Sequence, residues 1–202
     1  MRMHLPLAAL VFFAVTGCAA RDPVPVAAPG ATPEPTLVLV WVGRGEAERL
    51  EKGAWVRVPE FDYDFSVEQR RWPDRWESVK SLRRRHPAYD GSAGPRAQTY
   101  FFTVTYGAAR PNGEVPMHIE STLGAGDGVT DVEFRRTRLE LRADVSSMAP
   151  FDRYRLAQTY AYEAGALEET VALDDGDRPW VRNHERARLF ATRSWDGPPT
   201  RR

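Results

Sequence analysis

The sequence predicts an all-β domain, an antiparallel β-sandwich or barrel-like fold with one short helix in a long loop. Several runs of residues alternate between apolar and polar side chains, as strands with one buried face do. Short segments rich in Gly, Asn and Asp separate these runs and are typical of tight turns. The chain has 202 residues, of which 42% are hydrophobic and 28% charged, so it can form a hydrophobic core of its own.

The domain is expected to span residues 37–193. Its first strand is the apolar, β-branched run from Leu37 to Val42, which predicts burial on both faces. Residues 61–68, 97–106 and 115–123 alternate with period two, and further strands are expected at 130–145, 153–163, 166–173 and 187–193. In 130–145 the apolar phase shifts, so a bulge near 135–137 or a break into two strands is expected. The predicted turns lie at 51–53, 111–113, 124–128 and 174–177.

Residues 70–96 alternate little, and a connection of that length is unusual unless it is functional or contains an element of its own. Asp74 and Glu77 have capping-box spacing, and Trp76, Val79 and Leu82 share a face at helical spacing. We therefore expect a short helix here, ending at His86 before a proline.

Both ends of the chain are expected to lie outside this domain. Residues 18–36 form a Pro- and Ala-rich linker, which acts either as an extended spacer or as a tether with no length requirement. Residues 194–202, with two consecutive prolines, predict a disordered tail.

Residues 1–17 have the form of a secretory signal, because Arg2 precedes an apolar run, Leu5 to Val15, that is too short to span a bilayer. The sequence Val15-Thr16-Gly17-Cys18 follows. It resembles the lipobox of bacterial lipoproteins, a signal peptide ending before an obligatory cysteine. The resemblance implies that the Cys18 sulfur carries a diacylglyceryl group and that the leader is cut just before it. Two alternatives remain open, an ordinary secretory signal cut near Ala19 and a short uncleaved anchor.

An anchored Cys18 places the protein outside the cytoplasm and tethers it to a membrane through its acyl chains. Ala19 after the cysteine resembles the outer-membrane class of lipoproteins, so the expected location is the outer membrane, facing the periplasm or the surface.

The composition argues against several classes of function. Twenty-eight basic and 28 acidic residues cancel, which argues against nucleic acid as a partner. Cys18 is the only cysteine, so the domain holds no disulfide, cysteine-ligated zinc or cysteine nucleophile. His86, His118 and His184 lack zinc-ligand spacing, and Ser92 lacks the setting of a nucleophile elbow. We therefore expect no catalytic residue, metal or cofactor. The acidic pairs Asp62/Asp64 and Glu168/Glu169 are read as ordinary for a chain with this many acids.

The candidate binding residues fall in the long segment, where tryptophan and arginine gather. These residue types anchor many interfaces because they combine large apolar area with fixed hydrogen-bond donors. The candidates for a partner-binding surface are Trp72, Trp76, Arg83, Arg84, Arg85, His86 and Tyr89. The alternative is that Trp72 and Trp76 close one end of the fold while the arginines pair with nearby acids.

These observations lead to three hypotheses. The first is a membrane-tethered, non-catalytic lipoprotein domain that binds or organises another cell-envelope component, a protein or a glycan. The second is an envelope hydrolase acting on glycan, lipid or peptide. The third is a structural subunit of an envelope complex.

Overall fold

The computed structural model describes residues 34–92, 94–143 and 151–194. The predicted leader, Cys18 with its predicted lipidation, most of the 18–36 linker and residues 195–202 lie outside the described residues.

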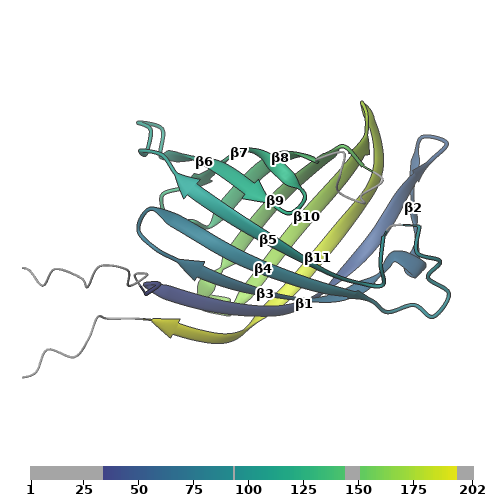
Figure 1. The fold of residues 1–202 in the computed structure, drawn as a ribbon, viewed down its shortest axis with the longest axis horizontal. Helices are drawn as coiled ribbons and strands as arrows, with labels where there is room; N and C mark the ends of the chain where they lie inside the picture. Colours follow the sequence, from purple (N-terminus) through teal and green to yellow (C-terminus); the bar gives the residue numbers. More distant parts are fainter. Residues whose placement is uncertain (1–33, 93, 144–150, 195–202) are drawn as a thin grey trace, which may run out of the picture. The chain divides into compact units, whose positions relative to one another are not determined.

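The prediction of an all-β fold is confirmed, and the fold is a closed barrel of ten antiparallel strands (Figure 1). An eleventh, short strand pairs only with the far end of the first strand. The strands are β1 (Leu37–Glu51), β2 (Ala54–Arg57), β3 (Tyr63–Arg71), β4 (Arg75–Arg84), β5 (Ala97–Tyr106), β6 (Glu114–Ser121), β7 (Gly124–Asp131), β8 (Arg136–Ala143), β9 (Arg153–Ala161), β10 (Ala166–Asp175) and β11 (Arg178–Ser194). Two single-turn 3-10 helices, η1 (Pro59–Phe61) and η2 (Tyr162–Ala164), complete the described elements.

The strands follow one another around the barrel in chain order, with β2 outside the ring. The ring closes where β1 pairs with β11 over a long antiparallel register, from Leu37 opposite Ser194 to Arg49 opposite Val181. Because the sheet closes, each of the ten strands has a paired neighbour on both sides. A closed sheet therefore has no free edge strand. We call the end where Leu37 and Ser194 pair the terminal end. The opposite end, which carries β2 and η1, is called the β2 end.

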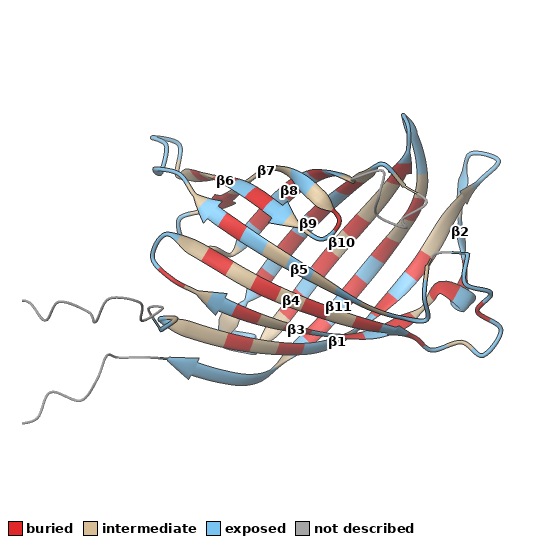
Figure 2. Cartoon of the chain, in the orientation of Figure 1, coloured by how far each residue is buried: buried red, intermediate tan, exposed pale blue. Residues whose placement is uncertain are grey.

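Side chains alternate between the barrel interior and the outside along nearly every strand, which Figure 2 shows as bands of buried and exposed residues. In β9, for example, Tyr154, Leu156, Gln158 and Tyr160 are buried, and the residues between them are exposed. The interior is thus the core of the protein.

The helix expected in residues 70–96 is wrong, because the described part of this segment forms the end of β3, all of β4 and an irregular connection to β5. The inward face of β4 is Trp76, Ser78, Lys80, Leu82 and Arg84. Three of these five side chains are polar or charged, so the apolar–polar alternation that marks a strand is missing from the sequence.

The turn expected at 124–128 is also wrong, since these residues belong to β7. Gly126 and Gly128 pack against the backbone of β8, where a Cβ atom would lie 2.0 Å from the Glu140 oxygen and 2.5 Å from the Arg138 oxygen, respectively. The glycines therefore allow β7 and β8 to approach each other closely, and they do not form a turn.

Two other expectations can be compared directly with the structure. Residues 130–145 do break into two strands, because β7 ends at Asp131 and β8 begins at Arg136. The run from Leu37 to Val42 is not buried on both faces, because Leu39 and Trp41 point inward while Val42 is 47% exposed.

Candidate functional site

The centre of the barrel holds a cluster of charged side chains from three strands. Lys80 Nζ on β4 lies 2.7 and 2.5 Å from the two carboxylate oxygens of Glu185 on β11 and 3.4 Å from Glu169 Oε2 on β10. The Tyr63 hydroxyl donates a 2.5 Å hydrogen bond to Glu185 Oε1. All four residues are buried. One ammonium group therefore faces two carboxylates in an interior shielded from water.

Burial and charge shift the pKa values of this cluster in definite directions. Desolvation raises the pKa of Glu169 to about 7, although the charge of Lys80 opposes this. The pKa of Lys80 is raised despite burial, because both carboxylates favour its charged form. At neutral pH Lys80 is thus charged, and Glu169 lies near its midpoint of protonation. Its Oε1 atom is buried and has no hydrogen-bond partner among the described residues.

A second chain of hydrogen bonds crosses the interior toward the terminal end. Trp41 Nε1 donates to Gln69 Oε1 at 3.2 Å, and Gln69 Nε2 donates to the Tyr160 hydroxyl at 2.7 Å. The Tyr160 hydroxyl donates to Gln158 at 3.2 Å. Gln158 lies opposite Glu169 in the register of β9 and β10, so the two networks are neighbours in the interior.

The terminal end is filled by large side chains. The Arg71 guanidinium lies 5.3 Å from the ring centre of Trp76, 5.5 Å from that of Tyr160, and 5.6 Å from that of Tyr162. Contacts between a guanidinium and aromatic faces are attractive. A small cavity of about 30 Å³ remains between this packing and the centre, and a larger one lies toward the β2 end.

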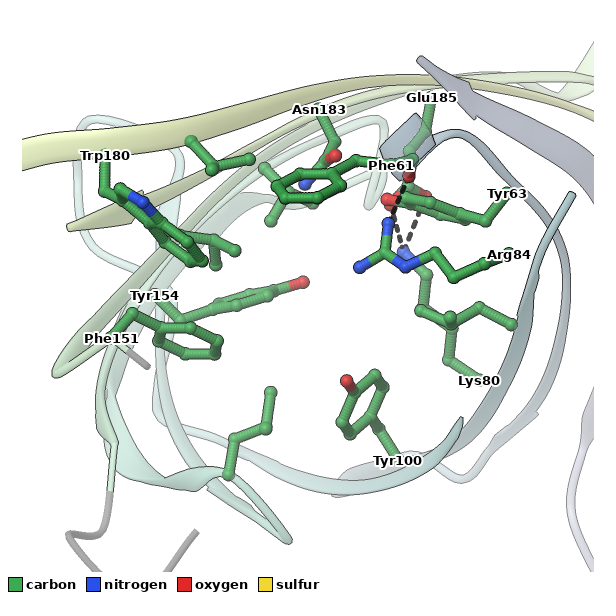
Figure 3. A pocket seen from close by; sticks show the side chains of 15 residues that line it. Phe61, Tyr63, Lys80, Arg84, Tyr100, Phe151, Tyr154, Trp180, Asn183 and Glu185 are labelled. Carbon is green, nitrogen blue, oxygen red and sulfur yellow. Dashed lines mark hydrogen bonds and ion pairs between the residues drawn. The ribbon is translucent and has the colours of Figure 1, made fainter. Parts of the chain in front are cut away.

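A cavity of about 50 Å³ lies inside the barrel toward the β2 end. Figure 3 shows side chains from several strands surrounding a central space, with the Tyr100 and Tyr154 hydroxyls and the Arg84 guanidinium directed into it. Its apolar and aromatic lining is Phe61, Leu82, Leu123, Phe151, Val171, Leu173, Trp180 and Val181. Its polar lining is Tyr63, Lys80, Arg84, Tyr100, Tyr154, Asn183 and Glu185. A cavity of this size holds a few water molecules or one end of a small organic molecule.

Two buried polar atoms of the cavity lining lack a hydrogen-bond partner among the described residues: Arg84 Nε and Asn183 Oδ1. A buried unpaired donor or acceptor costs about 1–3 kcal/mol. The cavity therefore presents groups that a bound molecule or water would satisfy.

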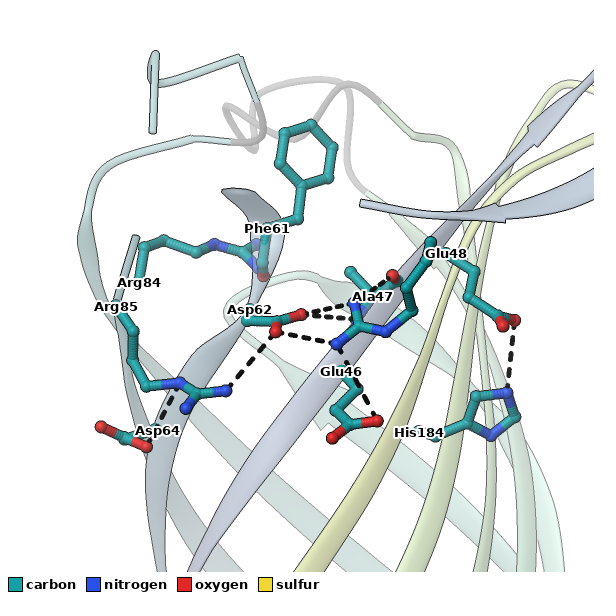
Figure 4. A network of polar contacts seen from close by, with 10 residues as sticks. Glu46, Ala47, Glu48, Phe61, Asp62, Asp64, Arg84, Arg85 and His184 are labelled. Carbon is teal, nitrogen blue, oxygen red and sulfur yellow. Dashed lines mark hydrogen bonds and ion pairs between the residues drawn. The ribbon is translucent and has the colours of Figure 1, made fainter. Parts of the chain in front are cut away.

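An outer network holds this end of the barrel together (Figure 4). Asp62, just after η1, accepts hydrogen bonds from the Ala47 backbone N–H at 3.0 Å and from Arg57 at 2.7 and 2.8 Å, and Arg85 lies 3.5 Å away. Burial raises the pKa of Asp62, but the hydrogen bonds from Arg57 and Ala47 outweigh it and hold the pKa below its usual range. Asp62 thereby ties η1 to β1, and the Phe61 carbonyl of η1 accepts a hydrogen bond from Arg84 Nη1.

The structure does not gather the seven predicted binding residues into one surface. Trp72 and Trp76 are buried at the terminal end, and Arg75 stacks on Trp72 at 4.2 Å. Arg84 and Tyr89 are buried at the β2 end. Arg83, Arg85 and His86 lie on the outside of that end, and Arg85 pairs with Asp62 and Asp64.

The structure brings together interior residues that sequence reasoning did not single out, chiefly Lys80, Tyr154, Glu169, Asn183 and Glu185. One signal was present, because Lys52 and Lys80 are the only lysines in an arginine-rich chain. Glu169 was noted only as half of an acidic pair, whereas the two members of that pair face opposite sides of β10, with Glu168 exposed and Glu169 buried.

Comparison with known proteins gives no family: no family model and no curated protein matches the sequence. Within residues 34–92, 94–143 and 151–194, no group of three or more His, Cys, Asp or Glu side chains is arranged to hold a metal ion. The same residues contain no helix of the length and hydrophobicity needed to cross a bilayer.

Proposed function

We propose that this protein binds a small organic molecule in the β2 end of its barrel. The observation that carries the proposal is the cavity of about 50 Å³, lined by aromatic side chains and by polar atoms that lack partners within the described protein. Barrels of this kind hold ligands in their interior when side chains do not fill it completely. A pocket for a whole drug-sized molecule measures about 300–1,000 Å³. The expected ligand is therefore small, or it inserts only one end.

This proposal specifies the first hypothesis from the sequence, a non-catalytic binding domain. The lipid anchor on Cys18 and the outer-membrane location stay part of the proposal and place the ligand in the cell envelope. The other expectations stay predictions from the sequence: binding to a partner protein or a glycan, a hydrolase activity, and a structural role in a complex.

The test compares the full chain with a variant whose cavity is filled. Val171 points into the cavity from β10, and the adjacent Ala172 points outward. The lipidated protein, reconstituted in nanodiscs, is screened by thermal shift against small aromatic and aliphatic acids, amides and amines. A ligand present at one hundred times its Kd stabilises the folded state by about 2.7 kcal/mol.

Val171→Phe is expected to abolish that stabilisation, and Ala172→Phe is expected to retain it. If Val171→Phe folds and still binds every molecule that the wild-type protein binds, the ligand is not in the cavity and the proposal is overturned.

A further inference from the structure

The charges that line the cavity are not equivalent. Lys80 is held by Glu169 and Glu185, so its charge is already compensated inside the barrel. Glu185 in turn is engaged by Lys80 and by the Tyr63 hydroxyl. Neither residue has a charge left for a ligand.

Arg84 differs from both. Arg84 is only 7% exposed, and no carboxylate among the described residues forms an ion pair with it. The guanidinium lies 4.8 Å from the ring centre of Tyr63 and 5.5 Å from that of Tyr89, so aromatic faces rather than an acid compensate its charge. Arginine stays charged in proteins, and a buried charge without a counter-ion is costly.

The hydrogen bonds of Arg84 leave one edge of its guanidinium without a protein acceptor in the described residues. Nη1 donates to the Phe61 carbonyl, whereas Nε is buried without an acceptor. No protein acceptor for Nη2 is found in the described part of the chain. Nε and Nη2 together form the edge of a guanidinium that binds both oxygens of a carboxylate side by side. Because Asp62 fixes η1, and Phe61 of η1 fixes Nη1, this edge is oriented before any ligand arrives.

The rest of the lining suits an anion with an apolar body. The Tyr154 hydroxyl points into the same space, and the Asn183 amide can offer either its oxygen or its NH₂ group. Phe61, Leu82 and Trp180 supply apolar walls. The only carboxylate in the lining is that of Glu185, which is already engaged. A cationic ligand would thus meet Arg84 with no free acid to compensate it.

We propose that the cavity ligand is an organic carboxylate with a compact aromatic or aliphatic body, and that Arg84 selects it by pairing with the carboxylate. This inference rests on the proposed function, since it requires that a small molecule enters the cavity.

The experiment uses matched pairs of probes with the same body and nearly the same size, one an anion and one its neutral amide: 2-naphthoate with 2-naphthamide, and hexanoate with hexanamide. Dissociation constants are measured for the nanodisc-reconstituted full chain. We expect each acid to bind at least about tenfold more tightly than its amide, because a hydrogen bond to a charged group contributes more than one to a neutral group. Arg84→Gln is expected to remove this preference, and Arg84→Lys to retain part of it. Arg188→Gln, on the exposed outer face of β11, is the matched control and is expected to keep the full preference.

A second readout does not depend on the variants folding. The Nε–H resonance of Arg84 in the wild-type protein is expected to shift when an acid is added and to stay in place with the amide. Equal binding of acid and amide by the wild-type protein overturns this inference and leaves the proposed function standing. No binding of any probe, acid or amide, counts against the proposed function itself.

Discussion

At the scale of single residues, the position of Lys80 has a physical reason. A lysine ammonium is compact and can approach two carboxylates at once, whereas the planar guanidinium of arginine needs more room and a fixed geometry. In an arginine-rich chain, the lysine stands where one cation must contact both Glu169 and Glu185. Removing a single partner from a buried ionic cluster leaves an uncompensated charge in a medium of low dielectric constant.

Lys80→Met is therefore expected to reduce the free energy of unfolding by about 3–5 kcal/mol at pH 7. Urea denaturation followed by tryptophan fluorescence measures the change. The other lysine of the chain provides the control, because Lys52 is exposed in the β1–β2 turn and Lys52→Met is expected to change stability by less than about 0.5 kcal/mol. Similar losses in the two variants would contradict the role of Lys80 in the interior.

At the scale of elements, strands with an apolar inner face were predictable, and strands with a polar or glycine-rich inner face were not. Strand β5 was predicted with its observed bounds, since Tyr100, Phe102 and Val104 share one face and threonines occupy much of the other. Strand β4 was read as a helix because Ser78, Lys80 and Arg84 occupy its inner face. The cavity was missed because its residues lie far apart in the sequence and come together only when the barrel closes.

Strand β7 illustrates how glycine acts as a strand residue in this fold. Its glycines allow the backbone of β8 to approach, and the built Cβ position of Gly126 would lie 2.0 Å from a β8 carbonyl oxygen. Real Cβ atoms do not approach backbone so closely, so any side chain there must displace one of the two strands.

Gly126→Ala is expected to lower the free energy of unfolding by about 1–3 kcal/mol, the usual cost of overpacking, although alanine restricts the unfolded chain more than glycine does. Ala125 points outward from the same strand and is exposed. Ala125→Val is therefore expected to be tolerated. Denaturation midpoints of both variants check the contrast, and a neutral or stabilising Gly126→Ala would show that β7 and β8 can separate without cost.

At the scale of the whole molecule, the interior cluster links global stability to pH. In the unfolded chain Glu169 titrates near its ordinary pKa of 4.5, and in the folded protein burial raises this value to about 7. Between these values the folded state holds a proton that the unfolded state has lost. The stability associated with Glu169 is thus fully present below pH 4.5 and is lost as pH rises through about 7.

We expect Glu169→Gln to remove this decline, which for one proton is at most about 1.4 kcal/mol per pH unit. Glu168→Gln, its exposed neighbour on β10, is expected to leave the pH dependence unchanged. Unfolding free energies measured from pH 4.5 to 8 for the wild-type protein and both variants test this. An unaltered decline in Glu169→Gln would assign the pH dependence to another group.

The pairing of Leu37 with Ser194 brings the first and last described strands to the end of the barrel opposite the cavity. A molecule that enters from the β2 end therefore does not pass the points where the chain joins and leaves the barrel. Substitutions at the Leu37–Ser194 pair should therefore leave this entrance unchanged.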